Sequence, residues 1–458
     1  MIFGKENDME KRVDLRGGPI GRALMQLALP LMATSLVQMA YNLTDMIWIG
    51  RVSAGAVAAV GVAGMFNWLS SGLVALARVG GQVRVGHCLG AGNEEGAVKY
   101  ACASIQMCMA MAVVYGAVLV GFAPGLIGFF KLNSPQVVLD AQRYLQVIGL
   151  GMPLVFFSQL LTALLTVTGD SRTPFRINAV GLVANIVLDP LFIFGLGPLP
   201  ALGAVGAGIA TVLGQLLVAA QFLAAALRDR HLLCHVRPFS RPDFSKMADI
   251  ASLSLPAAFQ NALFPLISMV ISRMVAGFGD EAVAVQKVGS QVESITWITA
   301  DGFAAAVNSF VAQNWGARDL PRARRGFFTA LGLISAWGLF TTALLLVLAQ
   351  PIFSIFIDEP AVVQMGVDYL EILAYSQLFM CWESVVVGAF AGVGRTLAPA
   401  VVCSTFTVAR IPMAMLLTAT ALGLCGIWWS ITISSVVKGV LCLAMFLLLL
   451  RKLEKQGC

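Results

Sequence analysis

Runs of apolar residues long enough to cross a lipid bilayer recur from end to end of this 458-residue chain. A transmembrane helix needs about 20 mainly apolar residues, and polar or Gly/Pro-containing breaks divide the sequence into twelve such runs. The apolar residues come in blocks, which favours helices over the alternating strands of a β-barrel. Only 12% of the residues are charged, about half the share in soluble proteins. We therefore predict an all-α polytopic membrane protein. The twelve spans are expected near residues 23–49, 55–87, 100–122, 142–168, 177–196, 203–227, 249–275, 282–313, 327–349, 366–392, 398–420 and 426–450.

The distribution of basic residues predicts the orientation, because Lys and Arg accumulate in cytoplasmic connections. Of the 30 Lys and Arg residues, 21 fall on the side of the termini, 3 on the opposite side, and 6 within or at the ends of spans. The three on the outer side are Arg51, Lys131 and Arg143. The polar N-terminal segment has no apolar core of its own, so we expect no cleaved signal peptide. Both termini are expected in the cytoplasm, and the chain in the plasma (inner) membrane.

The two halves of the sequence resemble each other. "LALP" at Leu27–Pro30 recurs as "LSLP" at Leu253–Pro256, and a nearly identical shift along the chain aligns Tyr144 with Tyr369. Each half has six spans, so both halves face the same way, and they are expected to form two six-helix lobes related by a pseudo-two-fold axis along the membrane normal. The predicted organisation is a cytoplasmic N-terminal segment (1–22), a first lobe (23–227), a cytoplasmic linker (228–248), a second lobe (249–450) and a cytoplasmic tail (451–458).

Two acidic residues lie within the predicted spans of the first lobe, where a charge is costly to bury. Asp45 lies in the apolar run "YNLTDMIWIG", where a carboxylate at the bilayer centre costs roughly 2.5–3.5 kcal/mol on insertion scales. In "NIVLDPLFIFG", Asn185 and Asp189 are four residues apart and share one helix face. Pro190 follows directly, removes a backbone donor and tends to kink the helix. A helical rise of about 1.5 Å per residue puts both acids at similar depth.

Three further polar residues of the first lobe are expected at that depth. Thr211 lies in the sixth span, Tyr41 is one turn before Asp45, and Tyr144 begins the fourth span. Two nearby carboxylates in a medium of low dielectric should not both stay ionised, so the pair is expected to hold a proton or a cation. In the alternative, Asp45 reaches the outer interface and Asp189 caps a broken helix.

The second lobe differs chemically from the first. Glu293 and Glu383 lie in its second and fourth spans, and Arg410 aligns with Asn185 across the repeat. A structural role for these residues is as well supported as an ion-coupling one. Methionines and aromatics suit promiscuous binding, although packing or lipid-facing positions explain them equally well. The candidates for a substrate cavity are Met39, Phe259, Gln260, Glu293, Glu383 and Arg410.

Several classes of function are disfavoured. The sequence has no GxxxxGK[ST] phosphate-binding pattern and no Ser/His/Asp constellation. "HLLCH", which includes His231, is an incomplete set of metal ligands. The nine cysteines show no framework, so we expect no disulfides. We therefore expect neither an enzyme nor an ATP-driven pump, and no cofactor apart from a coupling ion.

Arg84, close to the cytoplasmic end of the second span, is expected to extend its side chain to the interface.

The chain resembles the MATE (multidrug and toxic compound extrusion) family of antiporters over essentially its whole length. The segments that carry the resemblance are "LALPLMATSLVQMAYNLTDMIWIGR", "VRVGHCLGAGN", "NIVLDPLFIFG", "FVAQNWGA" and "GAFAGVGRTLAP". In the DinF-like branch the coupling residues are an Asp of helix 1, an Asn and an Asp of helix 5, a Thr of helix 6 and nearby Tyr. They match Asp45, Asn185, Asp189, Thr211, Tyr41 and Tyr144. The NorM-like branch has an acid in helix 7, where this chain has Gln260 and Asn261.

The resemblance implies secondary active efflux by alternating access. The expected substrates are amphipathic or cationic drugs, including antibiotics, exported in exchange for H⁺ or Na⁺. Na⁺ would bind at Asp45, Asn185, Asp189 and Thr211. The protein is expected to act as a monomer in the lipid bilayer and to bind no nucleic acid. The alternative is a flippase for lipid-linked oligosaccharides, whose anionic headgroup would suit Arg78 and Arg84, although such proteins often carry extra spans.

Overall fold

The structure is a computed structural model that describes residues 12–130, 134–195, 200–229, 232–238, 240–354 and 359–455. Within these ranges the chain is helical and contains no strand, which confirms the all-α prediction. Lys131, His231 and the first half of the predicted N-terminal segment lie outside the described residues.

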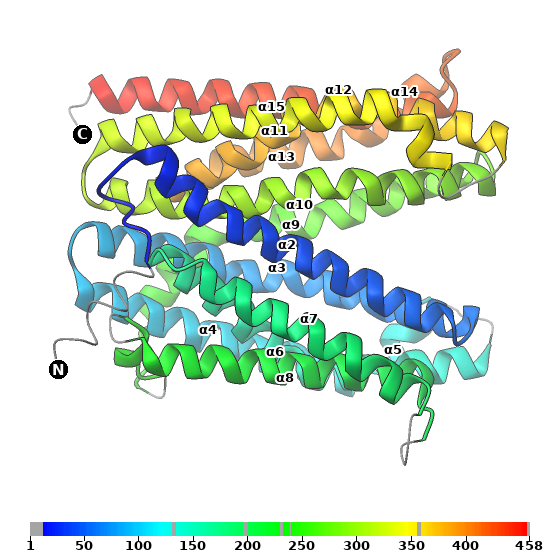
Figure 1. Cartoon of the computed structure of the whole chain (residues 1–458), viewed down its shortest axis with the longest axis horizontal. Helices are drawn as coiled ribbons and strands as arrows, with labels where there is room; N and C mark the ends of the chain where they lie inside the picture. The colour runs from blue at the N-terminus through cyan, green and yellow to red at the C-terminus, as the bar shows by residue number, and fades with distance from the viewer. Residues whose placement is uncertain are drawn as a thin grey trace. The chain divides into compact units, whose positions relative to one another are not determined.

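Long helices occupy nearly all of the predicted spans (Figure 1). In the first half they are α2 (Ile20–Gly50), α3 (Ala54–Gly90), α4 (Glu94–Gly121), α6 (Pro135–Val167), α7 (Arg172–Ile193) and α8 (Gly203–Arg228). In the second half they are α9 (Phe244–Ala276), α10 (Asp280–Gly316), α11 (Leu320–Ser354), α12 (Pro360–Gly392), α13 (Leu397–Val408), α14 (Arg410–Thr418) and α15 (Leu424–Lys455). Two short elements were not predicted, the helix α5 (Ala123–Gly128) and the 3₁₀ turn η1 (Leu233–His235).

The helices long and apolar enough to cross a membrane number eleven in the described chain, with α13 and α14 counted as one. The twelfth span is α10, which has 37 residues but also carries Lys287, Glu293 and Asp301. Its length suffices, since about 20 residues cross the hydrocarbon core. The prediction of twelve transmembrane helices is thereby confirmed. One detail was wrong, because the predicted span 398–420 breaks at Ala409. Pro412 explains the break, since a proline ring clashes with the carbonyl four residues earlier, here that of Val408.

The contacts divide the chain into two compact units. Unit 1 contains Ala33–Ala258 and the N-terminal segment up to Val13, and unit 2 contains Asp14–Met32 and Phe259–Cys458. The division falls inside α2 and inside α9, so each of these helices contributes to both units. The lobes predicted from the sequence begin at residues 23 and 249. The predicted lobes and the observed units therefore assign the first parts of α2 and α9 to different halves of the protein.

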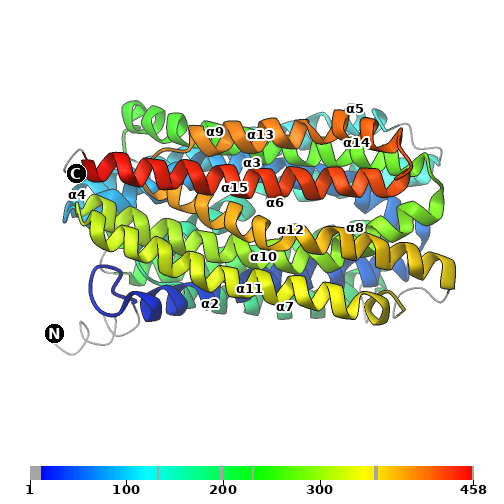
Figure 2. The same cartoon turned by 90° about the horizontal axis from the view of Figure 1, so that it is seen from above.

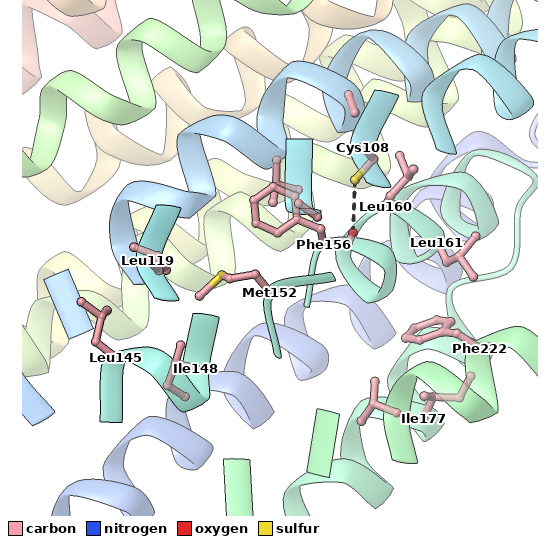
Figure 3. Close-up of a cluster of buried hydrophobic side chains, with 14 of the residues drawn as sticks. Cys108, Leu119, Leu145, Ile148, Met152, Phe156, Leu160, Leu161, Ile177 and Phe222 are labelled. Carbon is pink, nitrogen blue, oxygen red and sulfur yellow. Dashed lines mark hydrogen bonds between the residues drawn. The ribbon is translucent and has the colours of Figure 1, made fainter. Parts of the chain in front are cut away.

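Unit 1 has a core of apolar side chains from α3, α4, α6 and α8, which pack against one another. Its centre is shown in Figure 3, where Phe156, Met152 and Leu160 of α6 lie beside Cys108 of α4. The Cys108 thiol donates to the carbonyl of Phe156 at 3.6 Å. All four side chains are fully buried. These contacts hold α6 between its neighbours and fix the helix that carries Tyr144.

Unit 2 has its own core, in which α12 packs against α10, α11 and α15 (Figure 2). Tyr369 of α12 and Trp428 of α15 are both buried and meet edge to face, with ring centroids 5.1 Å apart. Towards the other end of α15, Phe446 packs on Phe327 and Phe390. The core thus fixes the rotation of α15 about its axis, and with it the face that carries the polar residues of this helix.

Ion pairs hold the predicted cytoplasmic side of unit 1. Arg12 pairs with Asp229, and Arg84 pairs with Asp249. The hydroxyl of Tyr100 also donates to Asp249, at 2.8 Å. Arg84, which was expected to extend its side chain to the interface, also has a carboxylate partner in unit 1. Its partner could not be recognised in the sequence because it lies 165 residues away, on another helix.

Gly116 permits the closest approach of α4 and α6. A Cβ atom at this position would lie 2.5 Å from the carbonyl oxygen of Gly149, a distance that forces backbone to move. We expect Gly116→Ala to destabilise the protein by about 1–3 kcal/mol, as other overpacked cores do. The measurement is the unfolding temperature of the detergent-solubilised protein. Gly121→Ala is the control, because its Cβ would meet nothing within 4 Å. Equal unfolding temperatures of the two variants would contradict the close packing.

Candidate ion-coupling site

Two helices bring the acids of unit 1 together. Asp45 lies in the second half of α2, within unit 1, and Asp189 lies near the end of α7. The two carboxylates are direct neighbours. Asp189 is fully buried and Asp45 is partly buried. The alternative in which Asp45 points to the outer interface and Asp189 only caps a helix does not describe this arrangement.

The remaining predicted residues of this group surround the two carboxylates. The amide nitrogen of Asn185 donates to Oδ1 of Asp189 at 3.1 Å, along one face of α7. The hydroxyl of Thr211, on α8, donates to Oδ2 of Asp45 at 3.5 Å. Tyr41 lies one turn before Asp45 and beside Thr211. Tyr144, on α6, is buried near both acids. The structure therefore brings together all six residues predicted from the sequence, which we call the acidic cluster.

Four buried oxygen atoms of the acidic cluster have no hydrogen-bond partner in the described part of the chain. They are Oδ1 of Asp45, Oδ2 of Asp189, Oδ1 of Asn185 and the hydroxyl of Tyr41. A buried polar atom without a partner costs roughly 1–3 kcal/mol, and more when it carries charge. One oxygen of each carboxylate is already engaged, so the unpaired atoms are the ones available to a ligand.

The chemistry of these atoms fits a small cation. The side chains that interact with the two carboxylates are acidic, amide, hydroxyl or phenolic, so none supplies positive charge. A proton on one carboxylate would convert it to a donor for the other. A bare cation such as Na⁺ would find oxygen ligands only, which hard cations prefer. Both occupants relieve the repulsion between two like charges in a largely buried site.

Pro190 contributes to the local structure of α7. It lies inside the helix, directly after Asp189, and removes the N–H that would bond to the carbonyl of Ile186. The helix continues for less than one turn and ends at Ile193. Asp189 thus lies next to the position at which the backbone hydrogen bonds of α7 are interrupted.

The predicted substrate-cavity residues are divided between the two units. Met39 lies in unit 1, whereas Phe259 and Gln260 lie in unit 2, where Phe259 is 60% exposed. The three ionisable candidates, Glu293, Glu383 and Arg410, all lie in unit 2, and both acids are close enough to influence the charge of Arg410. Their association follows from helix packing that no local sequence pattern shows.

Some members of this second group were missed in the sequence. Lys438 of α15 forms an ion pair with Glu383 at 3.0 Å. The guanidinium of Arg410 donates to the hydroxyls of Ser434, at 2.7 Å, and Ser435, at 3.0 Å. The available signal in the sequence was the spacing of Ser434 and Lys438, which are four residues apart and therefore share one face of a helix. It does not reveal which acid lies opposite, because that depends on how α12 and α15 are rotated.

Comparison with known proteins identifies the family. The family model MatE matches residues 30–191 and 256–416. These two stretches begin at Pro30 and Pro256 and end at Leu191 and Leu416, which are corresponding positions of the repeat found in the sequence. Together they cover more than half of the chain, so the match extends through both units.

Relatives and solved structures agree with this match. The chain is 27% identical over 438 residues to the probable multidrug resistance protein NorM of Thermotoga maritima, which covers 93% of this chain and 92% of that protein. It is 29% identical over 376 residues to the FAD transporter of Shewanella oneidensis, over 81% of this chain and 82% of that protein. A crystal structure of MATE in complex with MaD3S has the same fold, with a TM-score of 0.90 at 23% identity, over 97% of this chain and 99% of that one. This chain belongs to the MatE family of membrane transporters.

Proposed function

We propose that the protein is a cation-coupled multidrug efflux antiporter of the DinF-like type. Amphipathic or cationic drugs leave the cell in exchange for H⁺ or Na⁺, which occupies the acidic cluster. The observation that carries the proposal is the pair of neighbouring carboxylates, each with one oxygen engaged and one unpaired. The relative from Thermotoga maritima, named as a probable multidrug resistance protein, supports the drug as substrate.

The residues around the acids have distinct tasks in this mechanism. Asn185 and Thr211 each hold one carboxylate oxygen and so orient the other towards the shared position. When the coupling cation enters, it neutralises part of the negative charge of Asp45 and Asp189. When it leaves, the unpaired oxygens repel each other, and the cluster favours a different arrangement. If the cation disfavours the state that binds the drug, the drug disfavours the cation by the same free energy.

Anionic molecules are the competing class of substrate. The relative from Shewanella oneidensis is named an FAD transporter, and a lipid-linked oligosaccharide would likewise be anionic. A cluster that contains two acids without a basic partner favours exchange against a cation, whatever the cargo. Transport assays with a cationic dye, with FAD and with a lipid-linked sugar separate these substrates directly.

The cellular setting is part of the same proposal. The chain is a multi-pass membrane protein, and we place it in the plasma (inner) membrane with both termini in the cytoplasm. The excess of basic residues on the side of the termini supports this orientation. Drug would then leave outward as the coupling cation moves inward along its gradient.

Asp45→Asn and Asp189→Asn should each abolish coupled efflux, because an amide neither binds a proton nor neutralises a cation. We expect the rate of cation-driven efflux to fall tenfold or more. Ethidium efflux from proteoliposomes is measured under an imposed pH gradient and, separately, under a Na⁺ gradient. Glu95→Gln is the control, since Glu95 is an exposed acid of the same unit, paired with Lys99. Wild-type efflux in both asparagine variants would refute the coupling role.

Thr211→Val should weaken coupling without abolishing it. The variant keeps the shape of the side chain but removes the donor to Oδ2 of Asp45. A hydrogen bond to a charged group contributes about 1.5–3 kcal/mol, and the long contact here places the effect at the lower end. We expect the cation concentration for half-maximal efflux to shift by roughly tenfold or less. Thr211→Ser should restore the wild-type value. An unchanged value in Thr211→Val would show that the contact has no role.

Cys234 tests the orientation. It lies in the connection between α8 and α9 and is exposed, and the proposal puts this connection in the cytoplasm. A membrane-impermeant maleimide should label it in inside-out vesicles but not in intact spheroplasts. Cys234→Ser identifies its share of the label. Labelling of Cys234 in intact spheroplasts would reverse the proposed topology.

A further inference from the structure

Unit 2 contains a second buried group of ionisable residues, in which one acid has a direct basic partner, because Glu383 pairs with Lys438. Four helices supply the charges, with Glu293 on α10, Glu383 on α12, Arg410 on α14 and Lys438 on α15. With two acids and two bases the formal charge of the group is zero. We call these four residues the paired cluster.

The contacts show that the basic residues are held firmly. Nζ of Lys438 lies 3.0 Å from a carboxylate oxygen of Glu383, and the two side chains are 6% and 14% exposed. Arg410 is buried, donates to Ser434 and Ser435, and lies over the ring of Phe264. Charged side chains are stable in a buried position only when they are paired and hydrogen-bonded. Lys438 and Glu383 meet that condition as an ion pair, and Arg410 is held by the two serine hydroxyls of α15.

The internal repeat shows how the two clusters are related. Tyr144 of the acidic cluster corresponds to Tyr369, which neighbours Glu293. In the same alignment of the halves, Asp45 corresponds to Ile271 and Asp189 to Ala414. Asn185 corresponds to Arg410. The positions that carry two acids and an amide in unit 1 therefore carry two apolar residues and a guanidinium in unit 2.

We infer that Lys438 acts as a built-in counter-ion that keeps Glu383 from taking up the coupling cation. Its ammonium group occupies the place that a mobile cation would otherwise take at this carboxylate. The groups that face this ion pair are Cys403 and Cys442, whose sulfur atoms are 3.8 Å apart, and Arg410. A thiol is neutral and a guanidinium is positive, so none of the three adds negative charge. Lys438 thereby removes Glu383 as a second site of ion exchange, and so limits the number of cations exchanged per drug.

This inference rests on the proposed coupling role of the acidic cluster, and the test keeps the two apart. Binding of ²²Na⁺ to the purified protein is measured together with the infrared band of protonated carboxylic acids, so that an added cation is detected as Na⁺ or as H⁺. Lys438→Met leaves Glu383 without its partner. We expect it to gain about one bound cation per chain, and we expect Glu383→Gln in the same chain to remove that gain. The gain should persist when Asp189→Asn disables the acidic cluster.

Two further variants keep the test decisive if Lys438→Met folds poorly. Lys438→Arg keeps the charge and should bind as the wild type does. The double variant Glu383→Gln with Lys438→Met removes both charges together, which other proteins tolerate when a buried pair is replaced by neutral residues. It should retain cation-coupled ethidium efflux with an unchanged number of cations per dye.

The outcomes separate the two ideas. Folded Lys438→Met with no added cation would overturn the counter-ion role. A changed ion-to-dye ratio in the double variant, or wild-type cation binding that depends on Glu383, would do the same. If Asp189→Asn leaves wild-type binding intact, the proposed coupling site fails, while the result for Lys438 is still read from its own variants.

Discussion

The cost of charge in a medium that excludes water is the constraint on which this structure depends. In a span each ionisable side chain must be neutralised by a partner, must reach water, or must hold a ligand. Unit 1 and unit 2 satisfy this constraint in different ways. The acids of unit 1 have amide and hydroxyl partners for one oxygen each and leave the other unpaired. In unit 2, Glu383 instead pairs directly with Lys438.

A duplicated architecture makes this difference informative. The same family model matches both halves, at corresponding positions of the repeat. Substitution at corresponding positions can turn a position that carries an acid or an amide into one that carries a base. Asn185 and Arg410 illustrate the change, because each lies at the corresponding position of its half. The amide orients an acid, whereas the guanidinium supplies a permanent charge.

Much of this was accessible from the sequence, and the reasons are physical. Span positions follow from hydropathy because the bilayer sets a minimum apolar length, so even α10 was found despite its charges. The acidic cluster followed from the spacing of Asn185 and Asp189 on one helix face and from depth along neighbouring spans. What could not be predicted depends on the rotation of packed helices. The partners of Glu383 and Arg84 lie 55 and 165 residues away, and no local period encodes such pairs. The break before Arg410 was also missed, although Pro412 was its visible cause.

An asymmetric arrangement has a mechanistic advantage over two equal sites. If both units took up cations, each transport cycle would have to load and unload two clusters in concert. With Glu383 neutralised by Lys438, the proposed mechanism leaves the acidic cluster to decide which state of the transporter is favoured. The paired cluster contributes rigidity, since its hydrogen bonds link α14 to α15. In the proposed mechanism the free energy of the gradient therefore acts on the acidic cluster, where two carboxylates without basic partners give the largest response to one added charge.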